Sequence, residues 1–461
     1  MTEMPYLRFT PLAAALLLAG CSLIPTYQRP AAPVPEQWPA STGQEVGKVA
    51  DAAPDWKTFF ADESLRELIG IALEHNRDLR VAVLGLQQAR AQLGIRSADQ
   101  WPTLNAALSG SRAPNGSGEI AKSYSGGLLV TAYELDFFGR VASLKEQALA
   151  QYLASEAGSR SARIALVSGV AQAWIALLAD SEQQELARRT LDTREDTLKL
   201  TRLRFEHGAA SELELRLAES LAEGARVALE QSARQRAQDE NALALLLGQP
   251  LPAGLRAQLQ PGKLDALQLP ALAAGLPSQL LARRPDIQQA EQQLIAANAS
   301  IGAARAAFFP RISLTAGIGS ASKELSGLFK DGSWGYTLAP QLLLPIFDAG
   351  RNQAGLDSAQ AGRDIALAQY EKAIQSAFRE VADALAGRET LARQLAAQQA
   401  QAAADARRLE LTGLRLRHGA ASELDWLDAQ RSDFASQQAL LQTRLAWWQN
   451  QVALYKVLGG G

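Results

Sequence analysis

The sequence predicts a mainly helical protein that also contains four β-strands and is built from one unit written twice. Three observations lead to this fold class. Proline is absent from 115–249 and from 346–461, although the 461-residue chain contains 19 prolines. Since proline in a helix interior costs about 3 kcal/mol, both tracts are free to form very long helices. A segment near the end of each tract is repeated almost unchanged, and short alternating segments precede both tracts.

Composition argues against several classes of function. Lys and Arg number 46 and Asp and Glu number 48, and this net charge of -2 does not suit a nucleic-acid binder. A single cysteine, Cys21, and three histidines leave almost nothing for a zinc site, a Cys-His nucleophile or a disulfide framework. The sequence contains no HExxH, P-loop or GxSxG motif. We therefore expect no enzyme, no metal site and no cofactor.

The N-terminus has the features of a secretion signal. Arg8 precedes the short apolar run 12–19, which is too short to span a bilayer as a helix but suits the apolar region of a signal peptide. The run ends in LAGC, and small residues before a lone cysteine resemble the bacterial lipobox. We therefore predict a lipoprotein signal peptide over 1–20 and a covalent lipid on Cys21 as the first residue of the mature chain.

The residues after Cys21 are expected to form a lipidated, Pro-rich tether over 21–60. Ser22, rather than an aspartate, follows the cysteine. This resembles Gram-negative lipoproteins that are sorted to the outer membrane. The following stretch begins PTYQRPAAPVPEQWP, a composition that favours an extended chain.

The rest of the chain is an internal duplication, with a first repeat over 61–270 and a second over 271–461. LRFEHGAASEL at 203–213 recurs as LRLRHGAASEL at 414–424, an offset of 211. Upstream, 78–104 matches 286–312 at an offset of 208, with Gly94 aligned on Gly302. Each repeat therefore has the order helix, β segment, very long helix, turn, helix.

The repeated HGAAS segment predicts the turn of an antiparallel helical hairpin. Gly208 and Gly419 suit the left-handed position that ends a helix. A serine and an acidic residue three positions later then have the capping-box spacing that starts the next helix, as in Ser211 with Glu214 and Ser422 with Asp425. A continuous helix from Arg140 to His207 would be roughly 100 Å long. Such helices must pack lengthwise, in a coiled-coil-like assembly.

Four segments between the helices read as strands. They form two expected hairpins, 104–112 with 124–134 and 312–321 with 334–344. Apolar and small polar residues alternate, as in Ile312, Leu314, Ala316 and Ile318 on one face. Each strand has about the length of a tilted transmembrane strand.

Alternation alone fits an ordinary soluble hairpin pair as well as it fits transmembrane strands. The lipobox favours the membrane, and we expect no segment of the mature chain to be apolar enough for a spanning helix. A protein that spans a membrane without such a helix must close a β-barrel. Four strands are too few, because single-chain outer-membrane barrels start at about eight. The chain is therefore expected to pool its strands with copies of itself.

Several ordered motifs resemble one known family. They are CSLIPTYQRPAAPVP after the lipobox, YELDFFGR at 133–140, GLPSQLLARRPDIQQAE at 275–291, PIFDAGR at 345–351 and ELDWLDAQRS at 423–432. Together they resemble the outer-membrane factors of tripartite multidrug efflux pumps, in the lipoprotein, OprM-like branch of the TolC superfamily. The resemblance covers essentially the whole mature chain.

The resemblance implies a homotrimer whose pooled strands form one twelve-stranded β-barrel in the outer membrane. It also implies a periplasmic α-helical tunnel, so that the chain is lipid-anchored, crosses the outer membrane several times and extends into the periplasm. The implied partners are outer-membrane lipid, a periplasmic adaptor (membrane fusion protein) and an inner-membrane transporter of the resistance-nodulation-division type. The channel would conduct drugs passively and so contribute to antibiotic resistance.

The resemblance also assigns roles to two groups of residues. The hairpin tips are expected to contact the adaptor, at Gly208, Ala209, Ala210, Ser211, Gly419, Ala420, Ala421 and Ser422. A periplasmic gate is expected at Leu424, Asp425, Asp428 and Arg431, where an apolar ring would lie next to a carboxylate ring. A second interpretation of the gate residues stays open. Acidic residues at a helix start favour the helix dipole, and Asp428 with Arg431 is an ordinary i, i+3 surface pair.

Two other functions fit parts of the sequence. A TolC-like channel for type I protein secretion would share the fold and differ in its partners. A lipid-anchored periplasmic coiled-coil scaffold would use the long helices without a barrel, and it would become soluble once its acyl anchor is removed.

Overall fold

The computed structural model describes residues 22–38, 55–114, 116–260, 262, 264–270, 272 and 283–460. The chain divides into two compact units. Unit 1 contains the described residues of Met1–Ala32 together with Leu84–Ala157 and Gln289–Lys372. Unit 2 contains those of Pro33–Val83, Gly158–Gln288 and Ala373–Gly461. Each unit draws on both sequence repeats. Cys21 and the signal peptide predicted over 1–20 lie outside the described residues.

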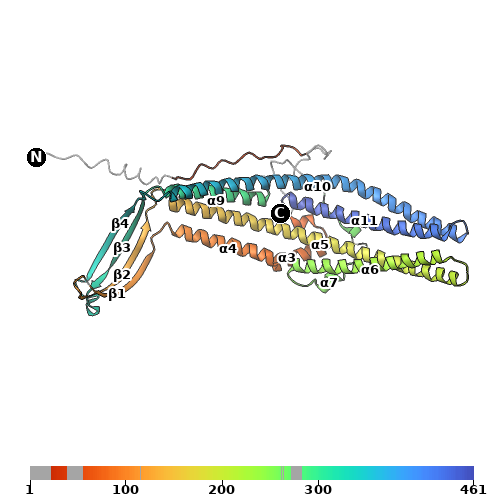
Figure 1. Cartoon of the computed structure of the whole chain (residues 1–461), viewed down its shortest axis with the longest axis horizontal. Helices are drawn as coiled ribbons and strands as arrows, with labels where there is room; N and C mark the ends of the chain where they lie inside the picture. The colour runs from red at the N-terminus through yellow and green to blue at the C-terminus, as the bar shows by residue number, and fades with distance from the viewer. Residues whose placement is uncertain are drawn as a thin grey trace. The chain divides into compact units, whose positions relative to one another are not determined.

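Two very long helices dominate the chain, as the proline distribution predicts. α5 (Arg140–Glu206) and α10 (Arg351–Arg417) each contain 67 residues, which corresponds to about 100 Å at 1.5 Å per residue. Each is followed by the returning arm of a hairpin, α6 (Glu212–Leu247) after α5 and α11 (Glu423–Val457) after α10 (Figure 1). The repeat order read from the sequence is therefore confirmed for these elements.

The shorter helices complete the pattern. They are α2 (Trp56–Phe59), α3 (Glu63–His75), α4 (Arg77–Ala98), α7 (Ala253–Arg256) and α9 (Pro285–Ala306), with 3-10 turns η2 (Leu264–Ala266) and η3 (Leu325–Gly327). α4 and α9 occupy matching positions in the two repeats. They differ in packing, because α4 has no buried residue whereas α9 buries side chains such as Leu294 and Ile301.

Four strands form one antiparallel sheet in unit 1. β1 (Leu104–Pro114), β2 (Ile120–Glu134), β3 (Arg311–Ser322) and β4 (Trp334–Leu343) lie side by side in sequence order (Figure 1). Both expected hairpins form, although β2 begins at 120 rather than 124. A third pairing, between β2 and β3, joins the repeats and aligns Leu128 with Ile318. Glycine is required where these strands meet, because a Cβ on Gly127 would collide with the Ile318 carbonyl oxygen.

The two outer strands of the sheet are exposed along their whole length. Every residue of β1 and β4 is exposed, including large apolar side chains. These are Leu104, Leu108, Trp334, Tyr336, Leu338, Leu342 and Leu343. Exposed apolar edge strands are a template for pairing with another chain. The sheet is therefore complete only when something covers these edges.

The expectation that no segment of the mature chain is apolar enough for a spanning helix is wrong. α5 contains an 18-residue stretch that is long and apolar enough to cross a membrane as a helix, and 56% of it is buried. The buried side chains of α5 include Val170, Trp174 and Leu177, which belong to the main hydrophobic cluster of unit 2. Because the protein itself covers these side chains, this stretch serves as a core helix.

The same hydrophobic cluster includes residues from the end of the predicted tether, 21–60. Phe59 and Phe60 are fully buried, and the ring of Phe59 stacks on Tyr455 with 4.5 Å between centroids. Phe60 meets the same ring edge-on at 5.4 Å. Stacked and edge-to-face aromatic pairs stabilise a core beyond their buried area. Residues 56–60 are therefore part of the folded helical core.

Residues 22–32 contain no helix or strand and pack on α9 in unit 1. Arg29 forms a two-pronged ion pair with the buried Glu291, with N–O distances of 2.6 and 2.7 Å. The Tyr27 hydroxyl donates to the same carboxylate at 3.0 Å. Burial and the neighbouring Glu291 charge raise the pKa of the Tyr27 phenol, so it remains a donor. This segment is therefore docked on the fold by charge-assisted hydrogen bonds.

Candidate functional site at the hairpin tips

The two hairpin tips have the same backbone conformation. Gly208 and Gly419 have φ angles of 72° and 71°, in the left-handed region. The next residue of each tip donates its N–H back to the helix, Ala209 to the Arg204 carbonyl at 2.7 Å and Ala420 to Arg415 at 2.8 Å. This is the Schellman arrangement, which satisfies carbonyls at a helix end. The predicted turn is confirmed in both repeats.

Each returning helix starts with the predicted capping box. Ser211 Oγ accepts from the N–H of Glu214 at 3.2 Å, and the Glu214 carboxylate accepts from the N–H of Ser211 at 2.6 Å. Ser422 and Asp425 repeat this exchange at 3.1 and 3.0 Å. The tip residues predicted to contact the adaptor are exposed, apart from the half-buried Ala210 and Ala421. Small exposed turns of this kind allow another helix end to approach closely.

Asp428, the central residue of the predicted gate, is held by two arginines from two helices. Its Oδ1 accepts from Arg431 of α11 at 2.6 Å, which is the i, i+3 pair expected from the sequence. Its Oδ2 accepts from Arg408 of α10, also at 2.6 Å. The sequence did not predict Arg408 as a partner of Asp428. In an antiparallel hairpin, residues at similar distances from the turn lie opposite each other, and this symmetry is the signal that could have found it.

The other two predicted gate residues are placed differently. Leu424 is 57% exposed on the first turn of α11. The Asp425 carboxylate is occupied by the Ser422 N–H and hydroxyl, so its contacts are those of a helix cap. The structure therefore brings Asp428 and Arg431 into contact, but it gives Asp425 a separate partner.

Neighbouring donors and charges keep the carboxylates of Asp425 and Asp428 ionised. The hydrogen bond from Arg408, with a further contribution from Arg431, lowers the pKa of Asp428 below its usual value. Hydrogen bonds from Ser422 lower the pKa of Asp425. Opposite charges and donors within hydrogen-bond distance favour the charged form of an acid. Asp428 therefore carries its negative charge at any pH near neutrality.

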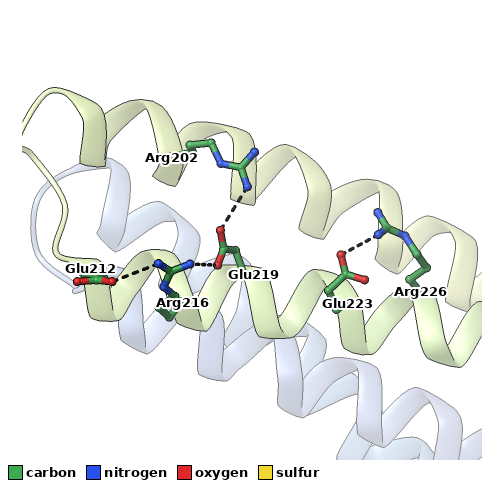
Figure 2. A network of polar contacts seen from close by, with 6 residues as sticks. All are labelled: Arg202, Glu212, Arg216, Glu219, Glu223 and Arg226. Carbon is green, nitrogen blue, oxygen red and sulfur yellow. Dashed lines mark hydrogen bonds and ion pairs between the residues drawn. The ribbon is translucent and has the colours of Figure 1, made fainter.

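The first hairpin has no acidic residue at the position that corresponds to Asp428. Arg216 and Leu217 stand where the second repeat has Leu427 and Asp428. Figure 2 shows a different network on this hairpin, in which Arg216 contacts Glu212 at 3.2 Å and Glu219 at 2.9 Å. Farther along the same face Arg226 contacts Glu223 at 2.7 Å. The two hairpins therefore carry charge on different helix faces.

A second ion pair near the tips joins the two hairpins. Glu423 of α11 is only 8% exposed, and its carboxylate accepts from Arg204 and, at 3.3 Å, from the Thr201 hydroxyl of α5. This pair could not be predicted from the sequence, because its partners are far apart in the chain. Among the described residues, no group of three or more His, Cys, Asp or Glu side chains is arranged to hold a metal ion.

A family model described as outer membrane efflux protein matches residues 68–249 and 276–460. These two segments fall in the two repeats and together cover most of the chain. The chain belongs to the outer membrane efflux protein family. It is therefore an outer-membrane protein with a periplasmic extension, and it functions in efflux.

Relatives at high identity support this assignment. The chain is 49% identical to a probable efflux pump outer membrane protein, TtgC of Pseudomonas putida, over 97% of this chain and 94% of that protein. It is 46% identical to outer membrane protein OprJ of Pseudomonas aeruginosa, over 99% and 96%. The fold is similar to the open state of the Neisseria gonorrhoeae MtrE outer membrane channel, with a TM-score of 0.86 and 41% identity over 96% and 98%. The resemblance seen in the sequence is confirmed.

Proposed function

We propose that three copies of this chain form the outer-membrane channel of a tripartite efflux pump, which passively conducts drugs and other small molecules to the exterior. The observation that carries the proposal is the four-stranded sheet with two exposed apolar edges, β1 and β4. Lipid does not tolerate an open sheet edge, because its backbone groups would have no partner. Pairing β1 of one copy with β4 of the next removes every edge, and three copies give a closed twelve-stranded barrel.

The long hairpins support a tunnel on the periplasmic side. α5 and α10 are far longer than one globular core needs, and their tips end in small, exposed turns. We assign these tips to a periplasmic adaptor (membrane fusion protein), which would link the channel to an inner-membrane transporter of the resistance-nodulation-division type. Leu213 and Leu424 add apolar surface beside the tips, since they are 76% and 57% exposed. Exposed apolar side chains rimmed by charge suit a protein contact.

Asp428 and Leu424 are the proposed gate, near the inner end of the tunnel. Three Asp428 carboxylates brought towards one axis would repel one another unless each is paired. Arg408 and Arg431 supply that pairing, so the salt bridges within the chain would hold the closed state together. Asp425 supports the gate indirectly, by starting α11 at Ser422.

No catalysis is required of such a channel, and its chemistry needs no metal or cofactor. The proposed covalent lipid on Cys21 would hold the N-terminus at the inner leaflet of the outer membrane, close to the docked segment 22–32. A lipid anchor and a barrel are independent membrane attachments.

The test is complementation of a Gram-negative host that lacks its own outer-membrane efflux protein. Expression of this chain should restore drug resistance when the cognate adaptor and transporter are present, and it should not do so without the adaptor. Purified protein should form trimers and conduct ions in planar bilayers. A folded protein that neither conducts nor restores resistance with its partners would contradict the proposal.

A further inference from the structure

We propose that Arg112 and Lys122 bind the phosphorylated headgroup of a lipid in the outer leaflet of the outer membrane. The two cations lie directly opposite each other near the turn between β1 and β2. This inference rests on the proposed barrel, because only a barrel brings one face of the sheet into contact with lipid. It adds a specific ligand to that barrel and names the residues that bind it.

One face of the sheet is mainly apolar, and the other carries mostly small or polar side chains. Side chains alternate along each strand, and the register carries each face across all four strands. The first face, here called the lipid face, includes Leu104, Leu108, Leu128, Ile318, Tyr336, Leu338 and Leu342. The second includes Asn105, Ser109, Ser125, Thr315, Thr337 and Gln341. Barrel strands turn their apolar side to the membrane and their polar side to the lumen.

The turns of both hairpins lie at the end of the sheet away from the helices (Figure 1). β1 follows α4 and β4 leads into α10, so the other ends of these strands adjoin the helices. Since the helices extend into the periplasm, the turns face the exterior of the cell. Arg112 and Lys122 share the lipid face with Leu108 and lie near the first turn. Both cations are therefore on the outer-leaflet side of the barrel.

The depth of the cations agrees with a headgroup site. From Leu104 to Arg112 the strand rises about 27 Å, at roughly 3.4 Å per residue. A strand tilt of about 40° reduces this rise to about 20 Å along the membrane normal, and the apolar band of such barrels is about 25 Å tall. The cations therefore lie at the outer border of the apolar band, where lipid headgroups begin.

Aromatic side chains follow the cations on the lipid face. The Tyr124 ring lies across Gly110, because a Cβ on this glycine would come within 3.1 Å of it. Farther from the turn, a Cβ on Gly126 would lie 3.1 Å from the Phe329 ring. Trp334 lies beside Phe329, with 6.0 Å between ring centroids. The order from charge through aromatic rings to aliphatic side chains matches a lipid read from its headgroup to its acyl chains.

Phe329 is held over the lipid face by the turn between β3 and β4. Its φ of 72° is in the left-handed region, which is costly for a residue with a Cβ. Its N–H donates to the Ser320 hydroxyl at 3.0 Å, and this hydroxyl donates to Ser333 at 2.7 Å. Phe329 is nevertheless 55% exposed, so its ring offers a fixed apolar surface to an acyl chain.

The two cations have no anionic partner among the described residues. Arg112 and Lys122 are exposed, and neither side chain forms an ion pair or hydrogen bond with another residue that the structure describes. Arg311, at the other end of the sheet, pairs with Glu134 at 2.6 Å. Like charges directly opposite each other in an antiparallel pair are destabilising. A phosphate group between Arg112 and Lys122 would remove this repulsion and accept charge-assisted hydrogen bonds from both.

A carboxylate of a neighbouring copy is the alternative partner. Asp331 is exposed in the turn that precedes β4. In the proposed barrel β4 of one copy adjoins β1 of the next, so Asp331 of the partner subunit would reach the side of Arg112. Lys122 belongs to β2, one strand farther from that edge. One lipid phosphate on the shared face serves both cations, and this favours the lipid.

Lipid binding tests the site. Purified trimer in neutral detergent is titrated with lipid A, a phosphorylated glycolipid, and binding is followed by native mass spectrometry. The double variant Arg112→Gln, Lys122→Gln should bind it about thirtyfold more weakly. Lipid A stripped of its phosphates should bind the wild type as weakly as intact lipid A binds the variant. Millimolar inorganic phosphate should not displace the lipid, and displacement would overturn the assignment to a lipid.

The double variant Lys323→Gln, Lys330→Gln is the matched control. It removes the same charge from the same end of the sheet, at exposed residues outside the pair. Its affinity for lipid A should remain close to that of the wild type. Equal losses in the two double variants would overturn the inference, as would wild-type affinity in the Arg112→Gln, Lys122→Gln protein.

Heat resistance of the trimer in pure detergent tests the alternative partner. If Asp331 of the partner subunit neutralised Arg112, both Asp331→Asn and Arg112→Gln would lower the fraction of heat-resistant trimer without any lipid present. That result would overturn the inference, and unchanged heat resistance is expected. A wild-type protein that is monomeric in the same spectra would contradict the proposed channel instead, so the two failures are distinguishable.

Discussion

Arg408 and Asp428 face each other across the second hairpin, with Nη2 of Arg408 2.6 Å from Oδ2 of Asp428. Arg431 holds the other oxygen of the same carboxylate. The proposed gate residue is thus fixed by both arms of the hairpin rather than by its own helix alone. A simple interaction with the helix dipole would need neither arginine.

The first prediction concerns this pair. Asp428→Ala and Arg408→Ala should both raise single-channel conductance in planar bilayers, since each removes the salt bridge between α10 and α11. Cells carrying either variant should also become more sensitive to large antibiotics such as vancomycin. Arg407→Ala is the matched control, because Arg407 pairs with Glu410 within α10 and its loss should leave conductance unchanged. Unchanged conductance in Asp428→Ala would favour the dipole interpretation.

The second prediction concerns pH. Burial, with the neighbouring Asp239 carboxylate, raises the pKa of Asp180 to about 7, and Arg236 acts in the opposite direction. In the unfolded chain this acid has its usual pKa of about 4. Between these values the folded state holds a proton that the unfolded state has lost, so stability falls as pH rises from about 4 to 7.

Asp180→Asn should remove that dependence. We expect the variant to gain thermal stability relative to the wild type at pH 8 and to gain little at pH 4, measured by circular dichroism. The Asp180 Oδ2 atom is buried without a hydrogen-bond partner, which makes its ionisation costly. A constant difference between the two proteins across this range would contradict the prediction.

The third prediction concerns the end of α6. Gly248 has φ of 70°, and a Cβ there would collide with the His75 carbonyl oxygen. Gly248→Ala should therefore destabilise the protein by more than the roughly 1–3 kcal/mol of backbone strain alone. Gly224→Ala, inside the same helix with open space around it, should instead stabilise it by about 0.5–1 kcal/mol. Urea unfolding of both variants gives the comparison.

The fourth prediction concerns the tips. Ala209→Trp and Ala420→Trp should lower drug efflux without lowering the amount of folded trimer, because a bulky side chain blocks a close approach by the adaptor. Ala209→Ser and Ala420→Ser keep a small side chain and should behave as the wild type. Drug resistance that survives both tryptophan changes would make the tips structural turns only.

The fifth prediction concerns the N-terminus. Cys21→Ser should abolish processing by the lipoprotein signal peptidase and labelling with palmitate, measured by mass and radiolabel. The trimer should still insert, since barrel strands carry their own membrane affinity. Labelling that persists in the variant would show that the lipid is attached elsewhere.

Local features of this protein could be predicted from sequence because they depend on a few neighbouring residues. Gly208 ends a helix because glycine adopts positive φ without strain, and Ser211 starts the next one because its hydroxyl reaches the third N–H. The four strands could be predicted for the same reason, since side chains two residues apart lie on the same side of a strand. The ends of the strands were predicted less accurately, because β2 begins at residue 120 instead of 124.

The sequence by itself therefore determined the duplication, the long helices, both turns and the four strands. Only the tertiary structure decided which helix faces meet. It paired Asp428 with Arg408, buried Glu423 against Arg204, and left its repeat counterpart Glu212 exposed. It also placed the apolar stretch of α5 in a core. Backbone preferences act within a few residues, whereas the contacts of a side chain depend on how distant segments pack, and two nearly identical repeats therefore acquire different surroundings.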